Sequence, residues 1–579
     1  MRTFGWKKLK KTLKVILFQM DFGSMKMILV FLLSFASLHG CGIAFIRLNK
    51  PLSYYQEKYG DPKWGLSKLM SLMDRQRNRG QDSAGIAISG MENGQIYIDQ
   101  DLSLDVLFSR FSQVETGTLL LGHLRYSTSG NGDLIQCHPL LHQADNLERT
   151  FALAGNFNLT NTKAILGCNN ELSDTFAILK TLAELYEGNS LTTLKRAAPL
   201  WDGGYLLCQL YADKKVLICR DSNGIRPGFY FQNDELLAVA SERSALTNTF
   251  NVDEKNILPI PPGHALLVSE LGEFQIQPFL EPALEMNCVF ERIYFSKSLD
   301  SKIYKERKEL GRQLAIRVWK ELSGDLTHTI FTYVPNSSQI AFLGLIEQID
   351  QFHREKIEKK CLENAPFGEI QSLLKQKVRN EVIINKNQGM RTFIAPDANR
   401  RQQVSQLYEI TPNIATENDT LVVVDDSIVR GTTLKESLIK KLIALNPKRI
   451  IIVSSAPPVR FPDCYGIDMS QISRLIAFQA AVEIFKEKKG HSPTQLCQIY
   501  DCSTHEELEQ KVAQLIMPEH TLWKGELKII YQSMEGLNQA IPLSQGQWVF
   551  TGQYPTPGGF KTLQTSFDNW IQKNDARSY

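Results

Sequence analysis

The sequence lacks the features that would place it in several common classes of protein. None of its ten cysteines forms a CxxC pair, and the closest spacing is Cys497-x4-Cys502, so a zinc or redox motif is not indicated. No run of 18 apolar residues follows residue 40, so no transmembrane helix is expected in the body of the chain. The chain after residue 40 is close to neutral, with 58 basic against 61 acidic residues, which gives no reason to expect a nucleic-acid-binding surface. The dispersed cysteines fit a reducing compartment.

The formal net charge of +3 for the whole sequence comes from the first 40 residues. They hold seven basic residues and one acidic residue, and the rest of the chain has 58 basic against 61 acidic residues. Their apolar run, residues 27–33 with a few mixed residues after it, is too short to span a bilayer and has the proportions of a signal peptide. Residues 1–40 are therefore expected to be a leader.

Two interpretations compete where this leader ends. The stretch "LHGC", residues 38–41, resembles the cleavage site of a bacterial lipoprotein, although His39 stands where a small residue is usual. The stretch "CGIA" that begins at the same Cys41 resembles the start of an amidotransferase whose nucleophile is an N-terminal cysteine. Lipoprotein processing would acylate both the thiol and the amine of Cys41, so the two interpretations exclude each other.

The pattern of the chain changes near residue 285. Before it, short β-rich runs such as "GTLLLGHLRYS" alternate with turns and helical patterns, which predicts packed antiparallel sheets flanked by helices. After it, "TIFTYV" and "TLVVVDD" each precede a loop and a helix, and "RIIIVSSAPP" follows, which is the rhythm of a parallel α/β sheet. This predicts a leader at 1–40, domains at 41–285 and 286–490, and a C-terminal extension at 491–579.

The most informative stretch is "TLVVVDDSIVRGTT", residues 420–433. At the carboxyl end of a parallel strand, loop amides and a helix N-terminus favour an anion such as phosphate. Asp425 and Asp426 would lie where ribose hydroxyls or a magnesium ion bind. A plain helix N-terminus capped by Asp and Thr is the structural alternative. The stretch resembles the phosphoribosyl-pyrophosphate (PRPP) loop of type I phosphoribosyltransferases.

Eleven short motifs, one of which contains this loop, occur along the chain in the order found in a known family. The first five resemble the glutaminase domain of class II glutamine amidotransferases: "CGIAF", "NRGQDSAGIA", "GHLRYSTSG", "LAGNFNLTN" and "LSDTFAIL". The other six narrow the resemblance to the amidophosphoribosyltransferase family: "RDSNGIRP", "ASERSAL", "CVFERIYFS", "RTFIAP", "VVVDDSIVRGTT" and "RFPDCYGIDMS". The resemblance runs from Cys41 to about residue 485.

The resemblance implies a fold and an activity. The fold is an α+β N-terminal-nucleophile glutaminase domain with four αββα layers, followed by an α/β type I phosphoribosyltransferase domain with a parallel sheet. The activity is that of a glycosyltransferase with glutaminase activity, which makes 5-phosphoribosylamine, glutamate and diphosphate from PRPP, glutamine and water, the first step of de novo purine (IMP) synthesis. A cytoplasmic homotetramer with purine-nucleotide feedback inhibitors is implied as well, with neither nucleic acid nor stable membrane association.

The resemblance also assigns roles to residues of the first half. Cys41 would be the nucleophile, with its own α-amino group as the base. The Asn156 amide and the backbone N–H of Phe157 would hold the oxyanion of the tetrahedral intermediate. Arg125 would pair with the α-carboxylate of glutamine and Asp174 with its α-ammonium.

These roles decide between the two interpretations of Cys41. Acylation would remove the nucleophile and the base together and leave the later motifs without a function. Cleavage of a propeptide after Gly40 is therefore expected. A non-catalytic, envelope-anchored lipoprotein that binds PRPP or nucleotide remains the alternative.

In the second half, the resemblance implies a PRPP site with magnesium as cofactor. The residues expected to bind PRPP are Arg391 of "RTFIAP" and the loop residues Asp425, Asp426, Ser427, Arg430, Gly431, Thr432 and Thr433. The residues expected at the metal are Ser337, Asp425 and Asp426.

The chain departs from the family at several places. Many members have His-Asn-Gly-Asn where this chain has "GNFN", residues 155–158, and a phenylalanine at 157 keeps the N–H but needs backbone angles that suit a Cβ. About a dozen extra residues, around "KPLSYYQEKYGDPKWG", follow Cys41. The pyrophosphate-loop position reads "PNSS", residues 335–338, without the acidic residue that some members have.

Apart from Cys41, the cysteines and histidines carry no predicted chemistry. Some family members bind a [4Fe–4S] cluster through four cysteines, and Cys288 and Cys464 match two of them. The C-terminal CxxC is absent, so no iron–sulfur cluster is expected. Cys137 and His138 are neighbours on an expected strand and would point to opposite faces, and His123 is also expected to be structural.

Overall fold

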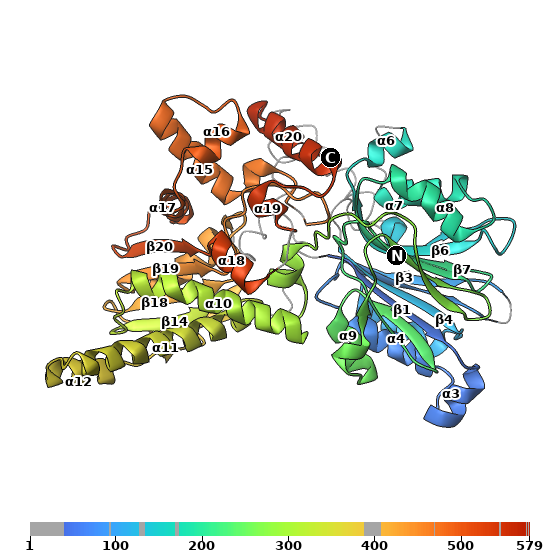
Figure 1. The fold of residues 1–579 in the computed structure, drawn as a ribbon, viewed down its shortest axis with the longest axis horizontal. Helices are drawn as coiled ribbons and strands as arrows, with labels where there is room; N and C mark the ends of the chain where they lie inside the picture. The colour runs from blue at the N-terminus through green and yellow to red at the C-terminus, as the bar shows by residue number, and fades with distance from the viewer. Residues whose placement is uncertain are drawn as a thin grey trace, which may run out of the picture.

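The computed structural model describes the chain from Gly40 to Tyr579, except for residues 92–93, 127–133, 168–172, 387–406, 433, 468, 543–545, 575 and 577. The predictions for leader residues 1–39 and for Arg391 and Thr433 therefore lie outside the described residues. Two bodies lie side by side, one built from the blue-to-green half of the chain and the other mainly from the yellow-to-red half (Figure 1). Among the described residues, no helix combines the length and the apolar character needed to cross a bilayer.

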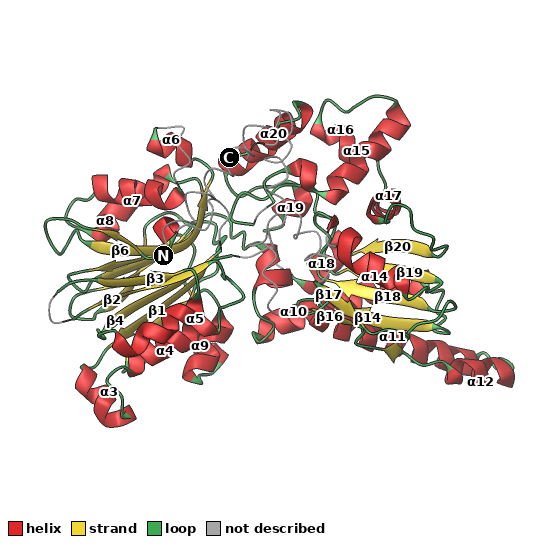
Figure 2. Ribbon diagram, turned by 180° about the vertical axis from the view of Figure 1, so that it is seen from behind, coloured by secondary structure: helices red, strands yellow, loops and turns green. Residues whose placement is uncertain are grey.

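Within the described residues, the strands of the first body form two antiparallel sheets packed face to face (Figure 2). One has the strand order β11-β9-β10-β1-β4-β2-β3, and the other has the order β13-β12-β8-β7-β6-β5. The strands of the first sheet are β1 (Gly42–Leu48), β2 (Ser83–Ser89), β3 (Tyr97–Asp101), β4 (Leu119–Arg125), β9 (Phe229–Gln232), β10 (Leu236–Ala240) and β11 (Leu258–Pro259). Those of the second are β5 (Leu140–His142), β6 (Phe151–Leu159), β7 (Gly203–Tyr211), β8 (Val216–Arg220), β12 (His264–Val268) and β13 (Phe274–Pro278).

Helices cover the outer faces of both sheets (Figure 2). Those on the side of the first sheet are α3 (Leu52–Tyr59), α4 (Trp64–Asp74), α5 (Leu104–Arg110) and α9 (Arg243–Phe250), and those on the side of the second are α6 (Thr162–Leu166), α7 (Asp174–Glu184) and α8 (Ser190–Ala197). Ile43 and Phe45 of β1 pack between the sheets, whereas Ala44 and Ile46 pack in the core under the helices. Because successive residues of a strand point to opposite faces, β1 is apolar along most of its length. The predicted four-layer αββα fold is confirmed.

The second body is built on a parallel sheet with the strand order β15-β14-β18-β19-β20. Its strands are β14 (Thr329–Tyr333), β15 (Arg379–Asn380), β18 (Thr420–Asp425), β19 (Arg449–Ser454) and β20 (Glu526–Tyr531), and β16 (Ile384–Lys386) pairs separately with β17 (Tyr408–Ile410). Its helices include α10 (Ser301–Glu321), α11 (Gln339–Leu362), α12 (Phe367–Lys375), α14 (Lys440–Ala444), α15 (Ile476–Lys489), α16 (Leu496–Asp501), α17 (His505–Ile516), α18 (Met534–Ala540), α19 (Trp548–Thr551) and α20 (Pro557–Ile571). Val422 and Val424 face the α10–α11 layer while Leu421 and Val423 face the opposite one, so the sheet is buried on both faces. The predicted α/β domain with a parallel sheet is confirmed.

The C-terminal segment contributes to this sheet. β20 pairs in parallel with β19 from Arg449–Glu526 to Ser454–Tyr531. Glu509 on α17 binds Arg317 on α10 at 2.8 Å and accepts a hydrogen bond from the Tyr531 N–H at 2.7 Å. Residues 491–579, which the sequence indicated as a C-terminal extension, thus supply a strand of this sheet. We propose that the phosphoribosyltransferase domain continues through them.

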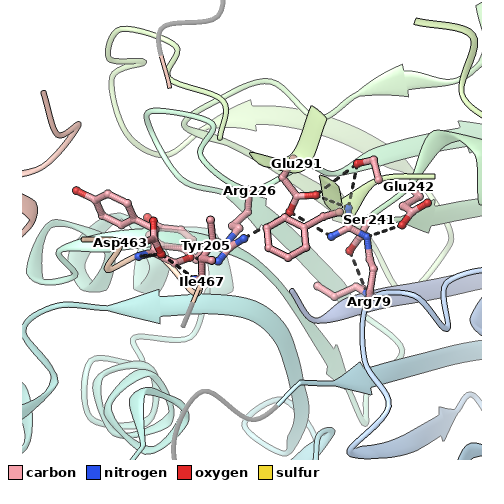
Figure 3. A network of polar contacts seen from close by, with 12 residues as sticks. Arg79, Tyr205, Arg226, Ser241, Glu242, Glu291, Asp463 and Ile467 are labelled. Atoms are coloured by element: carbon pink, nitrogen blue, oxygen red, sulfur yellow. Dashed lines mark hydrogen bonds and ion pairs between the residues drawn. The ribbon is translucent and has the colours of Figure 1, made fainter. Parts of the chain in front are cut away.

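A buried charged network joins the two bodies (Figure 3). Arg79 is completely buried and binds Glu242 at 3.0 Å and Glu291 at 2.6 Å. Glu291 lies on the short π-helix Glu291–Phe295 that leads into the second body, and it also contacts Arg226 at 3.4 Å. Arg226 in turn donates a hydrogen bond to the carbonyl oxygen of Tyr465 in the second body. Burial would raise the pKa of Glu291, but the two arginines outweigh it and the pKa of this carboxyl is lowered.

Replacing Glu291 by glutamine should destabilise the protein by about 3 kcal/mol, because it removes one of the two carboxylates that neutralise Arg79 and the carboxylate that contacts Arg226. The measurement is the urea concentration at the midpoint of unfolding. Glu285→Gln is the matched control, since Glu285 is 54% exposed and lies 3.9 Å from Arg220. Equal midpoints for the two variants would contradict a stabilising role for the network.

Candidate functional sites

The first site is built around Cys41, the residue before β1. The pairing of Gly42 with Leu124 places Cys41 beside Arg125, where β1 begins and β4 ends. The backbone N–H of Tyr126 donates to the Cys41 sulfur at 3.4 Å, and the thiol lies 3.6 Å from the Tyr126 carbonyl oxygen. The thiol is therefore held next to the cation expected to bind the carboxylate of glutamine.

The electrostatic surroundings of Cys41 contain both charges expected to bind glutamine. Burial is the largest effect on the pKa of the Cys41 thiol and raises it, and the charge of Asp174 raises it further. The hydrogen bond from Tyr126 and the charges of Arg125 and Arg226 lower it. The net shift is upward, so the thiol is protonated at neutral pH. A thiol in this state needs a base before it can act as a nucleophile.

Asp174 reaches the site as the first residue of α7. Its Oδ2 accepts a hydrogen bond from the backbone N–H of Leu159 at 3.1 Å, which ties the helix N-terminus to the end of β6. Arg125 donates to Oε1 of Gln136 at 2.7 Å and is 7% exposed. The positive charge of Arg125 at the end of β4 and the negative charge of Asp174 at the start of α7 thus both act on the Cys41 thiol.

Asn156 and Phe157 lie on β6, which contacts β1 across the interior of the sandwich. Asn156 is 2% exposed, and among the described residues its buried Nδ2 has no hydrogen-bond acceptor. A buried amide donor without an acceptor is costly unless a ligand takes the hydrogen bond. This is the state expected of a group that binds an oxyanion formed only during a reaction.

The last leader residue lies against the network that joins the two bodies. A methyl group added to Gly40 would lie 3.5 Å from Nη1 of Arg226, 3.7 Å from Oε1 of Glu291 and 3.9 Å from Nη1 of Arg79. Gly40 itself is buried. The bond that would have to be cut to free the amine of Cys41 therefore lies beside this charged network.

The second site lies at the carboxyl edge of the parallel sheet. Asp425 is the last residue of β18 and Asp426 follows it. Ser337, in the loop after β14, donates a hydrogen bond to Asp426, and Ser427 donates another at 2.7 Å. Ser455, directly after β19, donates to the carbonyl oxygen of Asp426 at 3.1 Å. The ends of the adjacent strands β14 and β18 thus bring together the residues that the sequence predicted for the metal, Ser337, Asp425 and Asp426.

Burial raises the pKa of both aspartates, and the charge of Asp426 raises that of Asp425 further. Hydrogen bonds from Ser337 and Ser427 act in the opposite direction on Asp426. Two adjacent buried carboxylates repel each other unless a cation or hydroxyl groups lie between them. Mg²⁺ prefers oxygen ligands and usually keeps waters and substrate phosphates, so this set of oxygens fits it.

The loop at residues 427–432 leads into the helix that follows β18. Gly431 has a φ of +71°, a left-handed conformation that glycine adopts without strain. The helix begins where Lys435 N–H donates to the Gly431 carbonyl oxygen at 2.9 Å, and it runs as a π-helix over Leu434–Ile439 before α14. Arg430 and Thr432 flank the glycine, so both lie at the helix N-terminus, where backbone N–H groups favour an anion.

Sequence reasoning missed three side chains near the paired carboxylates. The pKa of Tyr294 and that of Tyr408 are raised, first by burial and then by the charges of Asp425 and Asp426. Burial lowers the pKa of Arg307 to about 10, although Asp426 acts to raise it. Tyr294 lies on the π-helix Glu291–Phe295, Tyr408 on β17 and Arg307 on α10. Only the tertiary fold therefore brings these three residues to the loop. The motif "CVFERIYFS" contained Tyr294 but gave it no role.

The sequence is similar to those of known enzymes, although no protein-family model matches it. The amidophosphoribosyltransferase of Escherichia coli (strain K12) is 28% identical over 442 residues, which cover 72% of this chain and 81% of that protein. The amidophosphoribosyltransferase of Methanocaldococcus jannaschii is 26% identical over 551 residues, which cover 90% of this chain and 99% of that protein. The relatives thus match over most of their own length.

Solved structures share the fold. Glutamine PRPP amidotransferase from B. subtilis, complexed with ADP and GMP, superposes with a TM-score of 0.63 at 24% identity, covering 89% of this chain and 97% of that one. A structure described as the allosteric regulatory enzyme of purine biosynthesis superposes with a TM-score of 0.64 at 24% identity. The superposition covers 89% of this chain and 96% of that one. Ordered motifs, fold and relatives agree in making this chain similar to the amidophosphoribosyltransferases.

Proposed function

We propose that the protein is a glutamine-dependent amidophosphoribosyltransferase, which makes 5-phosphoribosylamine, glutamate and diphosphate from PRPP, glutamine and water in the first step of purine synthesis. The observation that carries this proposal is the presence of two complementary sites in one chain. A thiol flanked by Arg125 and Asp174 lies in the first body, and the paired carboxylates lie at the carboxyl edge of the parallel sheet in the second. A non-catalytic lipoprotein would have no use for the first of these sites.

The glutaminase half follows from the surroundings of Cys41. The free α-amine of the mature chain would take the thiol proton, since its ordinary pKa of roughly 8 lies close to neutrality. The sulfur then attacks the carboxamide carbon of glutamine, and the oxyanion binds the Asn156 amide and the N–H of Phe157. Collapse of this intermediate releases ammonia, and water hydrolyses the thioester to glutamate. Arg125 and Asp174 orient the amino-acid end of the substrate.

The phosphoribosyltransferase half uses the loop after β18. Ammonia attacks C1 of the ribose and diphosphate leaves. The small residues and backbone amides of the loop, with Arg430, would hold the phosphate groups, together with Thr433 and Arg391. Asp425, Asp426 and Ser337 would bind ribose hydroxyls or hold Mg²⁺, which neutralises the charge of the diphosphate when bound.

The same proposal extends to partners and location. Glutamine and PRPP are the substrates, and purine nucleotides are the proposed feedback inhibitors, in keeping with the ADP and GMP bound to the B. subtilis enzyme. A cytoplasmic homotetramer remains the expected assembly.

The active protein should begin at Cys41 with a free amine and an unmodified thiol, because the amine is the proposed base. The measurement is the mass of the N-terminal peptide of the purified protein, taken together with equal release of glutamate and diphosphate from glutamine and PRPP with Mg²⁺. A chain expressed to begin at Cys41 after removal of the initiator methionine is the control and should be fully active. Full activity in a chain that retains residues 1–40 would refute the mechanism, and a diacylglycerol-modified Cys41 would favour the lipoprotein.

A further inference from the structure

Two buried imidazoles hold Gly155, the residue before the proposed oxyanion donor Asn156. Nε2 of His123, on β4, lies 3.0 Å from the Gly155 carbonyl oxygen. Nδ1 of His138 accepts a hydrogen bond from the Gly155 N–H at 3.4 Å. The two rings are 4.5 Å apart between their centroids. Both polar backbone groups of Gly155 are therefore bound by side chains.

The second nitrogen of His138 reaches the other half of the substrate site. Because Nδ1 accepts from Gly155, the ring proton lies on Nε2, which is 2.8 Å from Oγ1 of Thr175 and donates to it. Thr175 follows Asp174, the residue expected to bind the ammonium group of glutamine, at the start of α7. One ring thus connects the strand of the oxyanion donor to the helix of the ammonium ligand.

The side chain of Phe157 explains why residue 155 is a glycine. A Cβ on Gly155 would lie 2.2 Å from Cδ1 of Phe157 and 3.0 Å from the carbonyl oxygen of Leu206. The Phe157 ring is also 5.3 Å from the His138 ring. The ring at 157 therefore occupies the space that a side chain at 155 would need.

Both imidazoles are neutral in this environment. Burial lowers the pKa of His123 to about 3, and it lowers the pKa of His138 well below its ordinary value, helped by His123 and Arg125. A neutral His138 keeps Nδ1 free of a proton, so the hydrogen bond from Gly155 persists at neutral pH.

We propose that His138 is a positioning residue of the glutaminase reaction, which sets the separation between the oxyanion donor Asn156 and the ammonium ligand Asp174. This inference rests on the proposed function. His138 was expected to be structural, and its hydrogen bonds go to Gly155 and Thr175. It acts through Gly155 and Thr175, each the neighbour of a proposed substrate-binding residue. A shift of about 1 Å between two such groups can cost on the order of a hundredfold in rate.

The test compares His138→Leu with His138→Gln in the full mature chain. Leucine fills similar space without hydrogen bonds, and kcat/KM for glutamine should fall by about fiftyfold, with a lower kcat and a higher KM. Glutamine can accept from Gly155 and donate to Thr175, so this variant should stay within about threefold of wild type. Synthesis with high ammonia should be unchanged in both, which separates positioning from loss of folding.

Thr175→Val removes only the hydrogen bond between the His138 ring and α7. This variant still tests the proposal if His138→Leu does not fold. It should raise KM for glutamine about fivefold with little change in kcat. The proposal is overturned if His138→Leu keeps its kcat/KM within threefold, if His138→Gln is as impaired as His138→Leu, or if Thr175→Val leaves KM unchanged. A wild-type chain that neither hydrolyses glutamine nor uses PRPP would refute the proposed function instead.

Discussion

Cys41→Ala is expected to abolish glutamine-dependent synthesis while the reaction with high ammonia continues. The thiol is the proposed nucleophile, and the nearby charges of Arg125 and Asp174, which are expected to bind substrate, do not supply a replacement nucleophile. The loss should exceed about a thousandfold in kcat, as is usual when a covalent nucleophile is removed. The proposed PRPP site lies in the other body, on elements that do not include β1. The measurement is diphosphate release with glutamine and, separately, with ammonium at high pH.

The matched control is Cys361→Ala, because Cys361 is a free, exposed cysteine at the end of α11. This variant should retain both activities. Equal loss of both activities in a folded Cys41→Ala protein would argue against two separate sites. Glutamine-dependent activity that survives the substitution would remove Cys41 from the mechanism.

Asp425→Asn or Asp426→Asn should weaken the use of PRPP by about 2–4 kcal/mol in transition-state stabilisation, as for the loss of one well-placed polar group. PRPP carries several negative charges, so simple electrostatics predicts that removing a carboxylate improves binding. The opposite is expected here because the two carboxylates are adjacent, with Asp426 buried and Asp425 half-buried, and would engage Mg²⁺ or ribose hydroxyls. The measurement is kcat/KM for PRPP at saturating Mg²⁺ and ammonia, which bypasses the glutaminase.

Asp350→Asn is the control for this pair, since Asp350 is 42% exposed on α11 and should have little effect. Hydrolysis of glutamine without PRPP should barely change in any of the three variants. If both loop substitutions leave kcat/KM within about twofold of wild type, the loop is not the PRPP site. The assignment of the second body as a phosphoribosyltransferase domain would then fail.

Features that depend on neighbouring residues could be predicted from the sequence. The apolar run of β18, the two carboxylates after it and the glycine before its helix all lie within residues 420–432. Alternation and turn residues in the same way predicted the antiparallel sheets of the first body. Such features depend on the preferences of adjacent residues, so a linear pattern is enough to indicate them. The predictions of the four-layer fold, of the parallel sheet and of Ser337, Asp425 and Asp426 at a metal came from this information and from the family resemblance.

By itself the sequence determined the strands, the loops and the residues that carry the proposed chemistry. Only the tertiary structure decided how those residues are supported. It placed β20 in the parallel sheet, Tyr294 and Arg307 beside the paired carboxylates, and His138 between Gly155 and Thr175. Each of these contacts joins elements that are distant in sequence, and no local preference favours one partner over another. They form because apolar faces pack in only one arrangement, which then fixes the polar groups at their edges.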